Sequence, residues 1–270
     1  MTAIMQRSAA ARAFDGIAAD YDNLFTRSSV GLAQRAAVWK CAERIFTTKG
    51  HLLELNCGTG EDAIHFAQQG FHVTSCDVSP EMIVQAQRKA IEASVSDHIK
   101  FHVKATETIN DLPAAPCFSG VFSNFSGLNC IEDLRGLALS LRDLVLPGTS
   151  LLFCFSTRYC LWEILWHLLR FDLKRSTRRW SGRSVTRLGE VRFPVYYPTR
   201  RQIERSFAPC FRLVGVYGIG ITVPPSYVGS WIERHLGMLR AFERTDTVIR
   251  RLPVARVLGD HMLLHFERAR

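Results

Sequence analysis

Residues 51–63 read His-Leu-Leu-Glu-Leu-Asn-Cys-Gly-Thr-Gly-Glu-Asp-Ala, a short apolar run that leads into a glycine-rich turn and then into an amphipathic stretch. The apolar run predicts a buried strand over 51–55, and the stretch that follows predicts a helix over 60–69. Gly58 and Gly60 let the backbone approach a ligand closely, and the free amides at the start of the helix favour electronegative groups. The segment therefore predicts a strand, a ligand-binding turn and a helix.

The same alternation continues along the chain. Further strands are expected near 71–76, 99–103, 118–123 and 149–155, and further helices near 80–93 and 131–144. Strands that alternate with helices are typical of a mainly parallel sheet with helices on both faces. The pattern therefore predicts an α/β fold of the Rossmann-like class.

Four regions are expected from the change in pattern along the chain. They are an N-terminal helical cap over 1–48, a core over 49–156, a basic, Trp-rich insertion or lid over 157–197, and the remainder of the sheet over 198–270. Within the last region we expect a helix over 199–207, strands over 211–221 and 261–266, and a helical insert over about 223–257.

Composition limits the classes of function. The 270 residues are 47% apolar, which is enough to bury the core of one globular unit. A net charge of +9 raises the question of nucleic acid, an anionic membrane surface or an acidic substrate as partner. The excess gathers between residues 170 and 201, where Asp172 and Glu190 are the only acidic residues. That stretch predicts a basic patch.

The cysteines argue against a disulfide framework or a metal site. All eight are scattered singly, and the sequence contains no Cys-x-x-Cys pair. His261 and His265 fall on a predicted strand, where ordinary packing is expected, so no metal ligand is assigned. The N-terminus lacks the apolar run of a signal peptide, and no apolar stretch reaches the length of a membrane span. Reduced thiols and a cytoplasmic location are the expectation.

Two carboxylates near the glycine turn bear on which ligand it binds. Gly58-x-Gly60-x-x-Ala63 satisfies a loose dinucleotide fingerprint, so a nicotinamide-dependent oxidoreductase is one alternative. Glu54, at the end of the strand, would repel a pyrophosphate and attract the ammonium of an amino acid. Asp77, at the end of the next strand, is placed to accept hydrogen bonds from ribose hydroxyls. Glu54 favours an amino-acid nucleoside, whereas Asp77 fits either ligand.

Several motifs are similar to those of a known family. The run Leu53-Glu-Leu-Asn-Cys-Gly-Thr-Gly60 and the run Cys76-Asp-Val-Ser-Pro-Glu-Met82 resemble motifs I and II of class I S-adenosylmethionine-dependent methyltransferases, in the branch related to the ubiquinone and menaquinone methyltransferases. The run Phe14-Asp-Gly-Ile-Ala-Ala-Asp-Tyr-Asp22 resembles that branch's N-terminal helix, and Phe118-Ser-Gly-Val-Phe-Ser-Asn124 its motif IV. The resemblance covers roughly residues 14–155 and implies a sheet whose last strand is antiparallel.

The resemblance also implies a set of residues around S-adenosylmethionine. Glu54, Gly58 and Gly60 would hold the methionine end, Asp77 the ribose, Met82 one adenine face, Asn124 and Phe125 the floor near the sulfonium, and Tyr21 would close over the cofactor. Asn56, within the glycine turn, is also expected to bind the cofactor. Asn56 stands where the family has its first glycine, and Asn tolerates a positive φ well. Ala105 stands where an aspartate meets the adenine amino group, which leaves Thr106 and Glu107 as its substitutes.

The acceptor is the open part of the hypothesis. The apolar run 161–171, with two Trp, favours a lid over a small, apolar or natural-product-like acceptor, or a peripheral contact with a membrane surface. The basic patch over 170–201 keeps an RNA methyltransferase or RNA-binding module as an alternative. A non-catalytic regulator that binds the cofactor also remains open. Methyl transfer needs mainly alignment in a dry pocket, and the sequence assigns no catalytic base.

Overall fold

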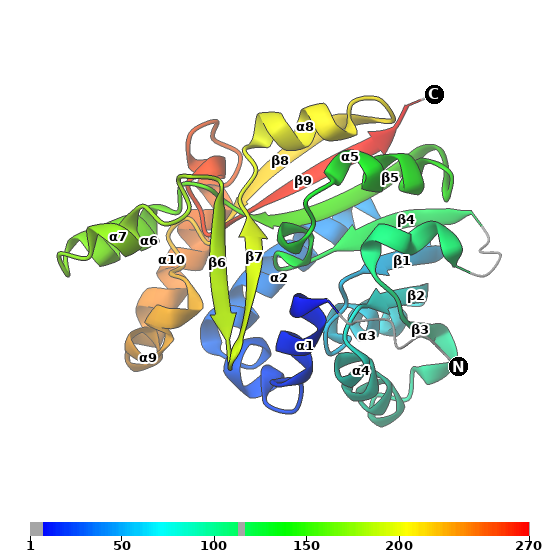
Figure 1. The fold of residues 1–270 in the computed structure, drawn as a ribbon, viewed down its shortest axis with the longest axis horizontal. Helices are drawn as coiled ribbons and strands as arrows, with labels where there is room; N and C mark the ends of the chain where they lie inside the picture. The colour runs from blue at the N-terminus through cyan, green and yellow to red at the C-terminus, as the bar shows by residue number, and fades with distance from the viewer. Residues whose placement is uncertain (1–7, 113–116, 270) are drawn as a thin grey trace.

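The computed structural model describes residues 8–112 and 117–269. A seven-stranded sheet runs through them in the order β3-β2-β1-β4-β5-β9-β8 (Figure 1). The strands are β1 His51–Leu55, β2 His72–Asp77, β3 Ile99–Val103, β4 Phe118–Ser123, β5 Val145–Ser156, β8 Phe211–Ile219 and β9 His261–Arg268. β9 is antiparallel to both of its neighbours, and the other pairs are parallel. The predicted α/β sheet with its antiparallel last strand is confirmed.

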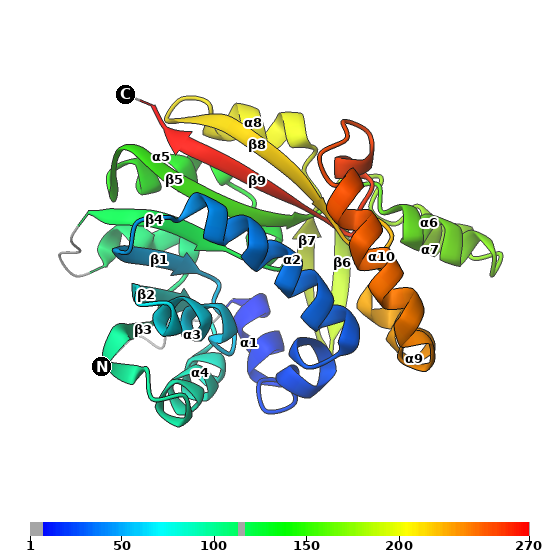
Figure 2. The same ribbon diagram turned by 180° about the vertical axis from the view of Figure 1, so that it is seen from behind.

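Helices cover both faces of this sheet (Figures 1 and 2). One face carries α2 Ser29–Ile45, α3 Glu61–Gln68 and α4 Pro80–Glu92, and the other carries α5 Leu134–Arg142 and α8 Arg200–Phe207. Neighbouring residues on a strand point to opposite faces, so Leu52 packs in the first layer and Leu53 in the second. Burial in these two apolar layers fixes which side chains of each strand face which set of helices.

Smaller elements gather at the carboxyl ends of the parallel strands. They are α1 Ala9–Asp15, a π-helix at Asp22–Thr26, α6 Leu161–Leu168, α7 Leu173–Ser176, α9 Gly229–Ile232, α10 Leu236–Ile249, and 3-10 turns at Thr106–Asp111, Gly127–Cys130, Ser226–Val228, Glu233–His235 and Ala255–Val257. A further 3-10 turn, Ser96–His98, leads into β3 at the opposite edge. β6 Arg183–Leu188 and β7 Val191–Tyr196 form a separate hairpin that lies against α1, with the rings of Phe14 and Phe193 5.8 Å apart. The lid segment therefore contains strands that the sequence analysis did not anticipate.

The described residues hold neither a disulfide nor a metal-binding group. Every cysteine among them is unpaired, and no cluster of His, Cys, Asp and Glu is arranged to hold a metal ion. Within the same residues, no helix combines the length and the apolar character needed to cross a bilayer.

Gly120 on β4 offers a test of how tightly the first layer packs. A Cβ at this position would lie 2.7 Å from Phe46 and 2.8 Å from Leu52. Gly120→Ala is therefore expected to lower the free energy of unfolding by about 1–3 kcal/mol, because the surrounding core has to shift. Urea denaturation measures the change. Gly237→Ala is the control, since a Cβ there has no heavy atom within 4 Å, and it should be neutral or slightly stabilising. Equal stability of Gly120→Ala and the wild type would contradict this packing.

Candidate cofactor and acceptor site

A cavity of about 430 Å³ lies at the carboxyl ends of β1, β2, β4 and β5. Its volume falls in the range of small-molecule sites. The wall is formed by the glycine turn after β1, the loops after β2 and β4, the N-terminal cap, the β6–β7 hairpin and the start of β9. Crevices at this edge of an open α/β sheet are where ligands bind in such folds.

The glycine turn presents open backbone to the cavity. Asn56 and Gly58 both adopt left-handed conformations, with φ of 56° and 53°. A Cβ placed on Gly58 would meet no heavy atom within 4 Å, so the space above this residue is free for a ligand. Gly60 differs, because its Cβ would lie 2.8 Å from the Cβ of Ala86. Gly60 is therefore required for the packing of α3 against α4, and it does not line the cavity.

Asp77 holds the turn in place and faces the same cavity. Its Oδ2 accepts a hydrogen bond from the Gly58 N–H, and its Oδ1 accepts one from the Ser79 N–H, both at 2.9 Å. Burial raises the pKa of the carboxyl, although these backbone donors act in the opposite direction. A carboxylate in such a place gains from further donors, and ribose hydroxyls are donors of the right kind. Val78 and Met82 supply apolar surface next to it.

Glu54 lies behind the cavity wall. Its carboxyl is buried and accepts a hydrogen bond of 2.5 Å from the Ser75 Oγ. Burial, together with the nearby charge of Asp62, raises its pKa well above the usual range. Glu54 is not among the residues that line the cavity, and its contact with a ligand ammonium stays a prediction of the resemblance.

The two substitutes for the missing adenine-binding aspartate also lie off the cavity wall. Thr106 is buried and accepts a hydrogen bond of 3.0 Å from the Asn56 Nδ2, and Glu107 is exposed. The predicted residues that do line the cavity are Tyr21, Asn56, Gly58, Asp77, Met82, Asn124 and Phe125.

Charged contacts pin the N-terminal cap over the glycine turn. The Lys89 Nζ lies 2.6 Å from Asp22 and 2.8 Å from Glu61, while the Thr59 Oγ1 donates to Asp22 at 2.6 Å. Asp22 follows Tyr21, so this clamp fixes the tyrosine at the cavity wall. The pKa of Asp22 is lowered, because the bonds from Lys89 and Thr59 outweigh the effect of its burial.

A second buried ion pair forms the floor beside the loop after β4. The Arg35 Nη1 of α2 lies 2.5 Å from Asp62, which also accepts hydrogen bonds from Trp39 at 2.6 Å and from the Asn124 Nδ2 at 3.2 Å. The guanidinium carbon of Arg35 sits 4.7 Å from the centre of the Phe125 ring. Phe125 is thus contacted from α2 and Asn124 from α3, two elements far away in the sequence.

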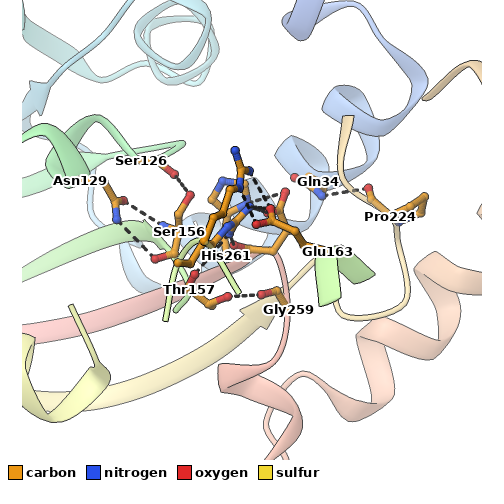
Figure 3. Close-up of polar contacts among 12 residues, drawn as sticks. Gln34, Ser126, Asn129, Ser156, Thr157, Glu163, Pro224, Gly259 and His261 are labelled. Carbon is orange, nitrogen blue, oxygen red and sulfur yellow. Dashed lines mark hydrogen bonds and ion pairs between the residues drawn. The ribbon is translucent and has the colours of Figure 1, made fainter. Parts of the chain in front are cut away.

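The far end of the cavity is bordered by an ionic network in which Glu163, Arg179 and Asp260 are buried (Figure 3). Glu163 on α6 accepts two hydrogen bonds from Arg178, at 2.6 and 2.8 Å, and lies 2.7 Å from Arg179. Arg179 also lies 3.1 Å from Asp260, at the start of β9. Burial opposes ionisation, yet these cations hold the pKa of Glu163 below its usual range. Two cations of the predicted basic patch are therefore paired in the cavity wall.

His261 follows Asp260 and stands between the two ends of the cavity. Its ring is edge-on to Phe125, with centroids 5.5 Å apart, and its Nδ1 lies 3.6 Å from the Asp260 carboxylate. Burial lowers its pKa against the attraction of Asp260, so the imidazole is neutral near pH 7. His265, four residues on, bonds Ser150 at 3.0 Å and lies off the cavity wall. The two histidines therefore do not act as a pair.

Residues 52–148 match the family model described as a methyltransferase domain. The tRNA 5-carboxymethoxyuridine methyltransferase of Escherichia coli (strain K12) is 27% identical over 148 residues, which are 53% of this chain and 56% of that protein. The ubiquinone/menaquinone biosynthesis C-methyltransferase UbiE of Rickettsia massiliae (strain Mtu5) is 28% identical over 104 residues, 36% of this chain and 41% of that protein. The core is that of a class I S-adenosylmethionine-dependent methyltransferase.

The methyltransferase resemblance is thus confirmed, and S-adenosylmethionine is the cofactor of this family. The chain spans about half the length of the curated relatives that it matches. The CcbJ methyltransferase from Streptomyces caelestis has the same fold, with a TM-score of 0.63 at 15% identity over 96% of this chain and 98% of that one. The nicotinamide alternative raised by the glycine pattern is not favoured.

Three features of the cavity are compatible with S-adenosylmethionine. Open space above Gly58, the Asp77 carboxylate, and the apolar surface of Val78 and Met82 match an amino-acid nucleoside in shape and chemistry. Several wall residues were not singled out from the sequence. They are Arg35, Asp62, Arg178, Arg179 and Asp260, whose partners lie on distant elements and leave no local pattern.

Proposed function

We propose that this protein transfers a methyl group from S-adenosylmethionine to a small, largely apolar acceptor. The observation that carries the proposal is a single cavity in which the Gly58–Asp77 end, suited to the cofactor, is continuous with an end enclosed by the lid. Bound S-adenosylmethionine would supply an electrophilic methyl group. The protein's own part is to align the acceptor and to exclude water, which can supply most of the acceleration.

Cofactor contacts are proposed for the predicted residues that line the cavity. Asp77 would accept from the ribose, Met82 and Val78 would face the base, and Asn124 with Phe125 would form the floor at the reactive end. Glu54, Gly60, Thr106 and Glu107 are proposed to act indirectly, through the shape of the turn and its neighbours. Tyr21, fixed by the Asp22 clamp, would cover the cofactor.

The apolar character of the acceptor follows from the hairpin. Alternate residues of a strand point to opposite sides, and here one side carries Thr186, Leu188, Phe193 and Val195 into the cavity wall. The ionic network of Glu163, Arg178, Arg179 and Asp260 is internally paired, so it adds two cations and two anions but little net charge. An acceptor with apolar bulk and one polar reacting group suits this environment.

His261 is proposed as the group that takes a proton from such an acceptor. It lines the cavity next to Phe125, its imidazole is neutral, and Asp260 lies on its Nδ1 side. A hydroxyl that donates to the remaining ring nitrogen would pass its proton there while its oxygen bonds to the methyl carbon and the sulfur–methyl bond breaks. A protonated amine would have to give its proton to this nitrogen first, so that its lone pair is free to attack. The proton would then leave from His261 to solvent after the product departs.

A second candidate is a nucleotide of RNA as acceptor. One observation favours it: the E. coli relative is named as a tRNA methyltransferase. The outer side of the hairpin also exposes Arg183, Arg187 and Arg192. A base would have to be extruded from its strand to reach the cavity, as in enzymes that act on flipped nucleotides.

Transfer of a tritiated methyl group distinguishes these candidates. The purified protein would be incubated with labelled S-adenosylmethionine and, separately, with a solvent-extracted lipophilic fraction or with total RNA. The proposal expects label to enter the lipophilic fraction. Label that enters RNA alone would favour the second candidate, and protein that binds S-adenosylmethionine without transfer to either fraction would favour a regulator.

A further inference from the structure

The segment from 161 to 176, which we call the α6–α7 arm, projects away from the body of the molecule in both views (Figures 1 and 2). Large apolar side chains are exposed at its tip. Leu169 is 80% exposed, Phe171 94% and Leu173 66%. Leu165 and Leu168 continue this surface along α6. Exposed apolar side chains gathered on one projecting element mark an interaction surface.

Basic side chains surround the same tip. Arg170, Lys174 and Arg175 are exposed, whereas Asp172 is the one acidic residue between Leu165 and Ser176. Asp172 lies 3.4 Å from Arg175 and offsets one of these three cations, so the tip keeps a net positive charge. The guanidinium of Arg170 lies 3.5 Å from the centre of the Trp166 ring and stacks on its face, while the residue as a whole stays exposed. The surface is therefore both apolar and cationic.

This combination argues against two other occupants. A second copy of the chain would bring the patch against itself in a two-fold contact, which sets the three cations against their own copies. Single-stranded RNA binds through aromatic platforms, while most of the apolar surface here is leucine. An anionic bilayer satisfies both features, because its acyl boundary receives leucine and phenylalanine and its headgroups attract arginine and lysine.

We propose that the α6–α7 arm docks the protein on an anionic membrane surface. Residues of the arm contact residues that line the cavity. Glu163 of α6 belongs to the ionic network, and the ring of His167 lies 5.9 Å from that of Tyr227, which lines the cavity. Docking would bring the acceptor end close to the lipid. The inference rests on the arm itself and holds whatever group is methylated.

Co-sedimentation with vesicles tests the proposal. Wild-type protein should bind vesicles of phosphatidylcholine with 30–40% phosphatidylglycerol, as a rough composition typical of anionic surfaces, and bind pure phosphatidylcholine far less. Leu169→Ser/Phe171→Ser/Leu173→Ser should lower the partition coefficient by about 100-fold, since three exposed apolar side chains lose their burial in lipid. The triple variant Arg170→Gln/Lys174→Gln/Arg175→Gln should also lower the partition coefficient by roughly 100-fold, because each cation contributes about fivefold.

A matched control is available on the far side of the molecule. Val84, Ile91 and Val103 are 53%, 67% and 53% exposed, and their replacement by serine should leave vesicle binding within twofold of the wild type. All variants should retain the melting temperature and the affinity for S-adenosylhomocysteine, which separates docking from cofactor binding. Vesicle binding that both arm variants leave unchanged would overturn the proposal. So would wild-type protein that binds RNA or dimerises through the arm while ignoring anionic vesicles.

Discussion

Replacing Asp77 by alanine is expected to lower the affinity for S-adenosylhomocysteine by about 100-fold. Each hydrogen bond from a ribose hydroxyl to a carboxylate is worth roughly 1.5 kcal/mol, and two such bonds amount to about two powers of ten. The cavity position of Asp77, between the Gly58 and Ser79 amides, places this carboxylate where the proposal needs it. Isothermal titration calorimetry measures the change.

Two variants make that result interpretable. Asp77→Asn retains an acceptor oxygen for the Gly58 turn but loses the charge, so it should fall between alanine and wild type. Asp143→Asn alters an exposed carboxylate that accepts a hydrogen bond from its neighbour Arg142, and this variant should bind S-adenosylhomocysteine like the wild type. Circular dichroism shows whether the fold survives in each case. Unchanged affinity in a folded Asp77→Ala protein would exclude this carboxylate as a ligand.

The second large effect is expected at His261. His261→Gln should lower kcat by about 10²–10⁴-fold with little change in KM, because a general base acts in the transition state and contributes that much. His265→Gln is the matched control on the same strand, since its ring lies off the cavity and bonds Ser150. It should turn over like the wild type. Equal loss in both variants would point to damage of β9 and against a base at His261.

The pH profile separates a base from a merely structural histidine. The neutral imidazole is the active form, so the rate should rise with pH as His261 loses its proton. Burial holds its pKa below 6.5, and the plateau should be reached by neutral pH. Asp260 raises this pKa and Arg179 lowers it, so Asp260→Asn should move the inflection to lower pH. A profile in which His261→Gln keeps the wild-type inflection would contradict the assignment.

Much of the core could be predicted because its signals are local. The strand that contains Leu52 and Leu53 is indicated by a continuous apolar run. The glycine turn between this strand and the next helix has few structural alternatives. The N-terminus of α4 likewise follows from Ser79, whose Oγ accepts from the Met82 N–H, and from Pro80 in the first turn. Some boundaries were wrong: β5 begins at Val145, four residues before the expected start, with an irregular register near Gly120, and α5 begins at Leu134, three residues after its expected start.

The end of the cavity proposed to hold the acceptor could not be predicted, because its residues have partners far apart in the sequence. Counting charges between 170 and 201 indicated one basic patch, whereas Arg178 and Arg179 are paired with Glu163 and Asp260. The hairpin is indicated in the sequence by Gly189 and Glu190, which form a two-residue turn between two runs of residues with high β-propensity. Glu54 shows the converse limit: its type and position matched the motif, and only the structure places Ser75 as its partner.

Calorimetric titration of the wild-type protein with S-adenosylhomocysteine, alongside NAD⁺ under the same conditions, tests the central claim most directly. The cavity geometry leads us to expect saturable binding of S-adenosylhomocysteine at one site per chain and no heat of binding with the dinucleotide. Saturable binding of NAD⁺ without any response to S-adenosylhomocysteine would contradict the assignment of the Gly58–Asp77 end of the cavity to the methyltransferase cofactor.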